Sequence, residues 1–207
     1  MLLHLIYGGR LHLTSKRGKK LSDEPALRAD AQKNRELILT AAEELFLEKG
    51  AGVPLEEVAK RAGVGIGTLY RRFPTREALL AATSNERFLS LAETSRARDP
   101  DLTPGDAVRA YLEELARNTS TYQNLATSIG TVIQCGTPGC NAITAEGHRL
   151  LQRGQEAGTI RRDVTYEDFI YVVTAISIAI ENDLSSKSRI GHLVDLFLNG
   201  ISVKGSD

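Results

Sequence analysis

Apolar residues recur at every third or fourth position through most of this chain. One such stripe spans residues 37–46, and Gly50 follows it as a helix stop. Another spans residues 190–201. The alternation typical of a half-buried strand is scarce, whereas the helix formers Ala, Leu, Glu and Arg dominate. The sequence therefore predicts an all-α protein of about nine helices, in which no segment repeats.

Prolines, glycines and capping residues set the predicted helix boundaries. Pro54 suits the first turn of a helix, and the TPGD segment at residues 103–106 combines a cap, a first-turn proline and an acid three residues after the cap. The CGTPGC segment at residues 135–140 is expected to be a loop. The predicted helices cover residues 30–49, 55–62, 66–73, 75–98, 141–157, 165–180 and 188–201, with another starting near residue 104 and one interrupted near Gly130.

Two parts of the chain carry opposite charge, although the total is zero. Residues 1–76 hold 14 Lys and Arg against 9 Asp and Glu, a net of +5, which leaves 12 against 17, a net of −5, for residues 77–207. We expect an extension (1–29), a DNA-binding head (30–76) and a body that does not bind DNA (77–207). The basic run SKRGKK at residues 15–20 is either a solvated tail or an arm on DNA.

Other classes of function find little support in the sequence. Cys135 and Cys140 are too few for a disulfide scaffold or a four-cysteine zinc site. Glu146 lies two positions from His148 and faces elsewhere on a helix, so no metal site is expected. No stretch approaches the ~20 apolar residues of a membrane span, and a signal peptide is not indicated. We expect a cytoplasmic protein without a cofactor or enzymatic activity, because no nucleophile–base pair or cofactor loop is present.

The segment RAGVGIGTLYRRFPTREALL, residues 61–80, constrains function most. On a helix over residues 66–73, Ile66, Leu69 and Phe73 share one face, which we expect to pack on the two preceding helices. The opposite side offers bare backbone, hydroxyls and two guanidinium groups. These groups suit DNA, because arginine bonds guanine or phosphate and glycine permits close approach. GVGIGT lacks the GK[ST] continuation of a phosphate-binding loop and does not follow a strand, which disfavours an enzyme.

The sequence LEEVAKRAGVGIGTLYRRFPTREALL resembles the DNA-binding signature of the TetR family of bacterial transcriptional regulators, over about residues 35–81. The resemblance implies a helical DNA-binding head, a helical ligand and dimer domain, and no catalysis. It also implies a supporting helix at 55–62 and a recognition helix at 66–73. Gly65 stands where a serine is frequent, and Arg72 stands where a histidine is common. The DNA-binding residues expected on this basis are Leu55, Gly65, Gly67, Thr68, Tyr70, Arg71, Arg72 and Arg76.

Sequence specificity requires two such heads, because one helix-turn-helix reads few base pairs and a two-fold dimer reads a palindrome. Residues 168–180 are apolar on nearly all sides, so either a second subunit covers one side or all of it is buried within one subunit. The resemblance implies that the last two helices form a homodimer. The predicted interface residues are Phe169, Val173, Ile176, Ile180, Leu193, Val194 and Phe197.

The resemblance further implies a cavity for a small organic effector among the middle helices. A pocket is usually apolar with a few placed polar groups. Candidates of this kind are Tyr111, Asn118, Tyr122, Thr131, Gln134, Cys135 and His148. The expected function is that of a repressor, which the effector releases from a palindromic operator in double-stranded DNA. The alternative is a DNA-binding regulator without a small ligand, controlled by a protein partner or by abundance.

Overall fold

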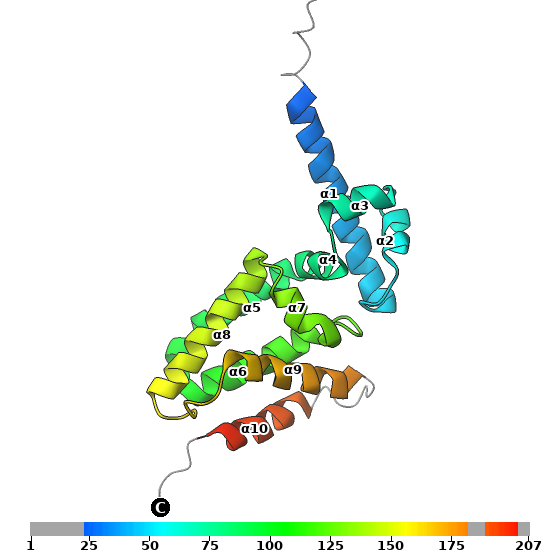
Figure 1. The fold of residues 1–207 in the computed structure, drawn as a ribbon. Coiled ribbons are helices and arrows are strands. Elements are labelled where there is room, and N and C mark those ends of the chain that lie inside the picture. Colours follow the sequence, from blue (N-terminus) through cyan, green and yellow to red (C-terminus); the bar gives the residue numbers. More distant parts are fainter. Residues whose placement is uncertain (1–22, 182–188, 203–207) are drawn as a thin grey trace, which may run out of the picture.

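The computed structural model describes residues 23–181 and 189–202, and these contain ten α-helices and two 3₁₀ helices (Figure 1). The prediction of an all-α protein is confirmed. The basic run at residues 15–20 lies outside the described residues. The helices are α1 Asp23–Lys49, α2 Leu55–Arg61, α3 Ile66–Arg72, α4 Arg76–Thr83, α5 Asn85–Arg98, η1 Asp99–Asp101, α6 Pro104–Thr119, η2 Ala126–Ser128, α7 Ile129–Ile133, α8 Pro138–Glu156, α9 Tyr166–Glu181 and α10 Ile190–Ile201.

Helices α1, α2 and α3 pack together as a head at one end of the molecule, and the first turns of α1 project beyond it (Figure 1). Leu45, Val58 and Leu69 have no exposed surface and tie the three helices to one another. Helix α1 begins at Asp23, seven residues before the predicted start at residue 30. The sequence Asp-Glu-Pro of its first turn favours this earlier start, so α1 includes the last residues of the segment that was expected to be an extension.

Two helices connect the head to the body, whereas one helix over residues 75–98 was predicted from the sequence. Helix α4 ends at Thr83 and α5 begins at Asn85, with Ser84 between them. The Thr83 hydroxyl donates to the Leu80 carbonyl oxygen at 3.0 Å, and Arg87 donates to the buried Ser84 hydroxyl at 3.1 Å. Serine and threonine side chains that bond to nearby backbone bend helices, which accounts for the break.

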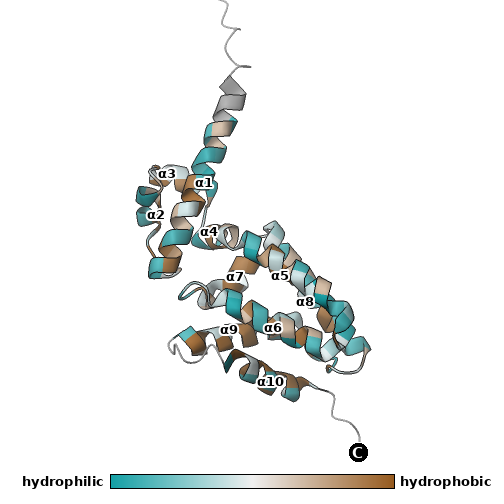
Figure 2. Cartoon of the chain, turned by 180° about the vertical axis from the view of Figure 1, so that it is seen from behind, coloured by the Kyte–Doolittle hydropathy of each residue, from teal (hydrophilic) through white to brown (hydrophobic). Residues whose placement is uncertain are grey.

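The body is built around α5, α6 and α8, which contact one another, with α9 and α10 packed on α6 (Figure 1). Helix α10 lies on the side of the body farthest from the head. Figure 2 shows hydrophobic residues over much of α9 and α10, whereas α5 and α8 carry more hydrophilic ones. In the described part of the chain, no helix combines the length and the apolar character needed to cross a membrane.

Helix α8 begins inside the segment that was expected to be a loop. The Thr137 hydroxyl accepts a hydrogen bond from the backbone N–H of Cys140 at 3.2 Å, and Pro138 occupies the first turn. This is the same cap that begins α6 at Thr103. Gly139 is needed here for its size, because an added Cβ would lie 2.3 Å from the carbonyl oxygen of Asn85. The start of α8 therefore rests directly on the start of α5.

Candidate DNA interface and effector pocket

Helix α3 is held by one face and leaves the other free. Leu69 has no exposed surface and Phe73 is buried, as expected, but Ile66 is exposed and does not complete the predicted inner face. Ile66 is the first residue of α3, so it lies at the edge of the contact with the other helices. The guanidinium of Arg35, on α1, stands 5.8 Å from the centre of the Phe73 ring and covers the far end of α3.

The free face of α3 carries the polar side chains expected from the sequence. Tyr70, Arg71 and Arg72 are exposed, and the Arg71 Nη2 donates to the Thr68 hydroxyl at 3.1 Å. No atom lies within 4 Å of a Cβ added at Gly67, so packing inside the chain does not require a glycine there. A bare backbone beside two arginines leaves room for a close-fitting partner. The structure thus brings these five predicted residues together on one surface.

The three remaining predicted DNA contacts lie at helix starts. Gly65 precedes α3 and is exposed, whereas Leu55 begins α2 with its side chain buried, so this side chain is not available to a partner. Arg76 begins α4, and its Nη1 donates to the carbonyl oxygens of Ala51 and Val53 at 2.8 and 2.5 Å. Arg76 therefore holds the segment that leads into α2, and a phosphate contact from it remains a prediction.

A cavity of about 350 Å³ lies among α7, α8 and α9 in the body. Two of the seven residues predicted for a ligand, Gln134 and His148, line it. The His148 ring stacks on the Tyr166 ring, with centroids 4.6 Å apart and planes tilted by 38°. The lining residues are Gly130, Ile133, Gln134, Asn141, Thr144, His148, Tyr166, Glu167, Ile170 and Tyr171.

Tyr111 stands behind the cavity wall. It is fully buried, its hydroxyl donates to the carbonyl oxygen of Ile143 at 2.8 Å, and its oxygen lies 3.3 Å from that of Tyr166. A Cβ added at Gly147 would lie 2.2 Å from the Tyr166 ring, so this glycine gives the ring its place against α8. Tyr111 thus supports a cavity residue without lining the cavity itself.

Tyr122 was also predicted to touch the ligand, but it lies where the body meets the head. Its ring centroid is 5.5 Å from that of Phe46 on α1, and its hydroxyl accepts from Arg87 Nη1 at 2.8 Å. The neighbouring Gln123 carbonyl accepts from the backbone N–H of Ala51 at 2.7 Å. Tyr122 therefore joins the two parts of the molecule.

Three further candidates do not line the cavity. The Asn118 amide donates to the Glu114 carbonyl oxygen at 3.0 Å, within α6. Thr131 and Cys135 are exposed on or next to α7 and bond to backbone carbonyls of their own segment. Burial raises the pKa of the Cys135 thiol, with smaller contributions from Cys140 and Glu77, so this thiol is not activated as a nucleophile.

Several cavity residues were not among those predicted from the sequence, although one signal for them was available. Asn141, Thr144 and His148 follow one another at spacings of three and four on α8, so they share one face of that helix. Glu167 and Tyr171 repeat this spacing on α9. Polar residues at helical spacing in two neighbouring helices indicate a polar wall, but the facing of the two helices was needed to show it.

The predicted dimer stripe on α9 is turned into the subunit instead. Phe169 and Val173 have no exposed surface, nor does Val194 on α10, and Ile176 and Ile180 are nearly as buried. A side chain without exposed surface in one subunit has none to bury against a second, so Phe169, Val173 and Val194 cannot contact a second subunit in this arrangement. Helix α6 covers this face, which is possible because α9 is apolar on more than one side.

The opposite faces of α9 and α10 remain uncovered in the single chain. Tyr171, Ile178 and Leu196 are 71%, 41% and 57% exposed, while Leu193 and Phe197 are half-buried. Exposed large apolar side chains that gather on two adjacent helices mark an interaction surface. A dimer interface on these two helices therefore stays a prediction, with different residues on α9.

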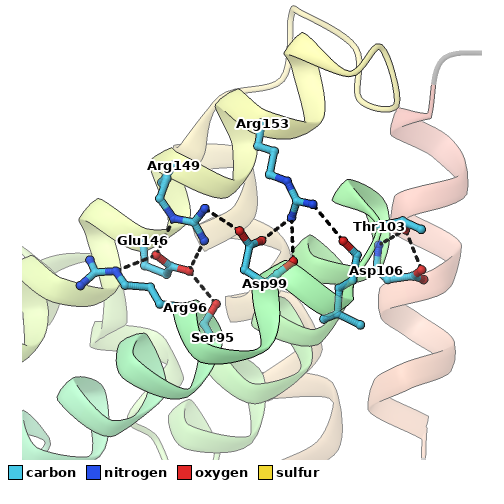
Figure 3. A network of polar contacts seen from close by, with 9 residues as sticks. Ser95, Arg96, Asp99, Thr103, Asp106, Glu146, Arg149 and Arg153 are labelled. Carbon is cyan, nitrogen blue, oxygen red and sulfur yellow. Dashed lines mark hydrogen bonds and ion pairs between the residues drawn. The ribbon is translucent and has the colours of Figure 1, made fainter.

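A buried carboxylate fastens α8 to α5 on the side away from the cavity (Figure 3). Glu146 has no exposed surface, and its oxygens accept from the Ser95 hydroxyl at 2.7 Å, from Arg96 at 3.1 Å and from Arg149 at 2.8 and 2.9 Å. Burial by itself would raise the pKa of Glu146, but hydrogen bonds from Arg149, Ser95 and Arg96 outweigh it and hold the pKa below its usual value.

The same cluster continues to the end of α5. Arg149 also donates to Asp99 at 2.9 Å, and Arg153 donates to Asp99 and to the Leu102 carbonyl oxygen, the latter at 2.9 Å (Figure 3). Asp99 follows α5 directly, while both arginines belong to α8. The two helices are thus linked along their lengths, so a displacement of α8 carries α5 with it.

Two family models match the chain. Residues 38–83 match the model of bacterial regulatory proteins of the tetR family, which here covers the head and α4. Residues 103–203 match the model of the C-terminal domain of SbtR-like transcriptional regulators, which here covers α6 to α10.

Known proteins resemble the chain in part or throughout. A helix-turn-helix transcriptional regulator of Staphylococcus aureus strain MRSA252 is 40% identical over 63 residues, 29% of this chain and 32% of that protein. The match thus spans about a third of that curated relative. The TetR transcriptional regulator SCO0520 of Streptomyces coelicolor is 29% identical, with a TM-score of 0.52, over 83% of this chain and 99% of that one. RolR in complex with resorcinol is 22% identical, with a TM-score of 0.60, over 86% and 91% of the two chains, a likeness of fold.

Proposed function

The chain belongs to the TetR family of bacterial transcriptional regulators, and on that premise we propose that it is a homodimeric repressor, which a small organic effector releases from a palindromic operator. The exposed face of α3 carries the DNA-binding part of this proposal. Arg71 and Arg72 stand beside the bare backbone of Gly67, and Leu69 and Phe73 anchor the helix from behind. An anchored helix with such a face fits the major groove.

Selection of bound sequences from random double-stranded DNA, at near-physiological salt, tests this part. An enriched palindrome is expected, with half-sites about 34–36 Å apart or a multiple of that distance. Arg71→Ala should weaken operator binding by about 1–3 kcal/mol and relax one base position if Arg71 reads guanine. The matched control is Arg162→Ala, which removes an exposed charge from the body. Enrichment of no sequence at either low or near-physiological salt would contradict the proposal.

The dimer is proposed to form through the uncovered faces of α9 and α10. Both helices lie on the body, away from α3, so two subunits joined there can present both heads to one DNA duplex (Figure 1). Leu196→Arg should give monomers in sedimentation equilibrium, because it places a charge among apolar contacts. The control is Lys60→Arg, a conservative change at an exposed position of α2, which should leave the dimer intact. A monomeric parent protein at micromolar concentration would refute this part.

The effector is proposed to act through the contacts between α8 and α5. The cavity wall includes α8, and α8 is bonded to α5, which continues through Ser84 into α4 and the head. An effector releases DNA only if it binds the non-binding arrangement more tightly. RolR, which shares the fold, has been solved with resorcinol, and this supports a small organic molecule as the effector class. Structures with and without a releasing compound should differ in the separation of the two heads, and identical separations would refute this route.

A further inference from the structure

The hydroxyl groups behind the cavity point their protons away from it. Tyr111 donates to the Ile143 carbonyl oxygen at 2.8 Å, and a carbonyl can only accept, so the single Tyr111 proton is committed. The contact of 3.3 Å between Tyr111 and Tyr166 then requires Tyr166 to be the donor. Burial raises the pKa of both phenols, so both hold their protons at neutral pH.

The hydrogen bonds run in the same donor-to-acceptor direction from the cavity surface inward. The Thr144 side chain lies close enough to the Tyr166 phenol to lower its pKa by hydrogen bonding, against the larger effect of burial, and Thr144 lines the cavity. Because the Tyr166 proton goes to Tyr111, Thr144 is the donor in this pair. Its oxygen lone pairs are what remains for a molecule in the cavity. The row from Thr144 through Tyr166 and Tyr111 to Ile143 therefore ends at the cavity as an acceptor.

Two other lining residues also offer acceptors. The Asn141 amide nitrogen donates one of its two protons to the Gly136 carbonyl oxygen at 3.2 Å, which leaves both acceptor sites of its amide oxygen and one N–H available. Glu167 adds a carboxylate, and none of the lining residues in the described part of the chain is a lysine or an arginine. An anionic molecule would be repelled by this carboxylate, and no lysine or arginine of the lining would offset the repulsion.

The apolar and aromatic residues of the lining suit a small ring. Ile133 and Ile170 line the cavity together with the stacked rings of His148 and Tyr166. Its volume of about 350 Å³ corresponds to about 12 water molecules at ~30 Å³ each. A single substituted ring fits this space.

We propose that the effector is a small, non-anionic ring compound whose polar end donates hydrogen bonds, a hydroxyl or a protonated amine, to Thr144, Asn141 and Glu167. This inference rests on the proposed function, because it specifies the chemistry of the effector in the cavity assigned there. Two requirements on the effector follow. It carries no carboxylate, and its polar end is a hydrogen-bond donor.

Four probes of similar size test these two requirements. Benzyl alcohol and benzylamine carry a hydrogen-bond donor, benzyl methyl ether lacks one, and benzoate is an anion. Their affinities for the full-length protein are measured by titration followed with NMR. Benzyl alcohol and benzylamine should each bind at least about fivefold more tightly than the ether and benzoate, since one hydrogen bond is worth that factor. Equal affinities for all four, or benzoate at least as tight as benzyl alcohol, would overturn the proposal.

Two variants tie the preference to the named residues. Thr144→Val should reduce benzyl alcohol affinity about fivefold and leave the ether unchanged, while Thr94→Val, at an exposed site on α5, should change neither. Glu167→Gln should weaken benzylamine relative to benzyl alcohol and improve benzoate. Glu167 is exposed, so this variant is expected to fold. Loss of all probes together in Thr144→Val would overturn the assigned contact.

The two proposals fail in distinguishable ways. Operator binding is measured separately, by fluorescence anisotropy on the selected palindrome. If the operator binds and none of the probes does up to its solubility, the ligand class is refuted and the DNA-binding function stands. If the donor probes bind with the expected ranking and no palindrome is enriched, the ligand class is supported and the repressor function is refuted.

Discussion

The buried Glu146 carboxylate gives the sharpest test of how the body is held together. Glu146→Gln keeps the shape of the side chain but removes its charge and turns one acceptor into a donor, which then faces the arginines of α5 and α8. Removal of one partner from a buried ion pair costs about 3–5 kcal/mol. We expect a loss of about 3 kcal/mol in the free energy of unfolding, because Arg96 and Arg149 are partly exposed and can regain water.

The assay is urea unfolding at pH 7, at one fixed protein concentration, because dimers unfold in a concentration-dependent way. Glu156→Gln is the matched control, since Glu156 is exposed near the end of the same helix and pairs with Gln152 within one turn. Its unfolding free energy should change by no more than about 0.5 kcal/mol. The m-value should stay constant in both variants if the fold is kept.

The pH dependence provides an independent check. The pKa of Glu146 is lower in the folded protein than its usual 4.5, so its stabilisation is present above that value and is lost as the pH falls through the folded pKa. The deficit of Glu146→Gln should therefore shrink below pH 4.5. A deficit under about 0.5 kcal/mol at pH 7, or one of the same size in acid, would refute the assigned role of Glu146.

Three further outcomes are expected from urea unfolding. Gly50→Ala should destabilise the protein by about 1–3 kcal/mol more than Gly158→Ala. Both glycines have positive φ, but only at Gly50 would an added Cβ meet an atom, the Gln123 carbonyl oxygen at 2.8 Å. Equal losses of stability would contradict this contact. Thr137→Ala should cost about 1 kcal/mol through loss of the α8 cap, and no change would mean that the cap is unimportant. Gly147→Ala should cost about 1–3 kcal/mol and abolish probe binding, since it displaces Tyr166; unchanged binding would contradict that placement.

The head could be predicted from sequence because its signals are local. The stop at Gly50, the short segment before Gly63 and the inner position of Leu69 follow from spacing and capping within a few residues. These choices agree with the packing in the structure, where α2 rests on α1 and α3 rests on α2. Ile66 is the exception, since periodicity gives the face of a helix but not how far its neighbours extend.

The body was predicted less well than the head, because the sequence pattern of its helices does not show which side of each helix faces the core. Helix α9 is apolar on more than one side, so its pattern allowed Phe169 to face either α6 or a second subunit. The choice was made by α6, which covers that residue and leaves Tyr171 outside. The break at Ser84 arises from side-chain hydrogen bonds within one turn, at Thr83 and Ser84, together with the burial of Ser84, which the apolar periodicity of residues 75–98 did not show.

The sequence by itself determined the helices, most of their ends and the exposed residues of α3, because each depends on contacts between residues three or four positions apart. Only the tertiary structure decided the cavity and the Glu146 cluster on the other side of α8. Asn141 and Glu167 come from different helices, and Glu146 meets Ser95 across 51 positions of sequence. Such groups come together only after the helices have packed, so the acceptor character of the cavity belongs to the fold.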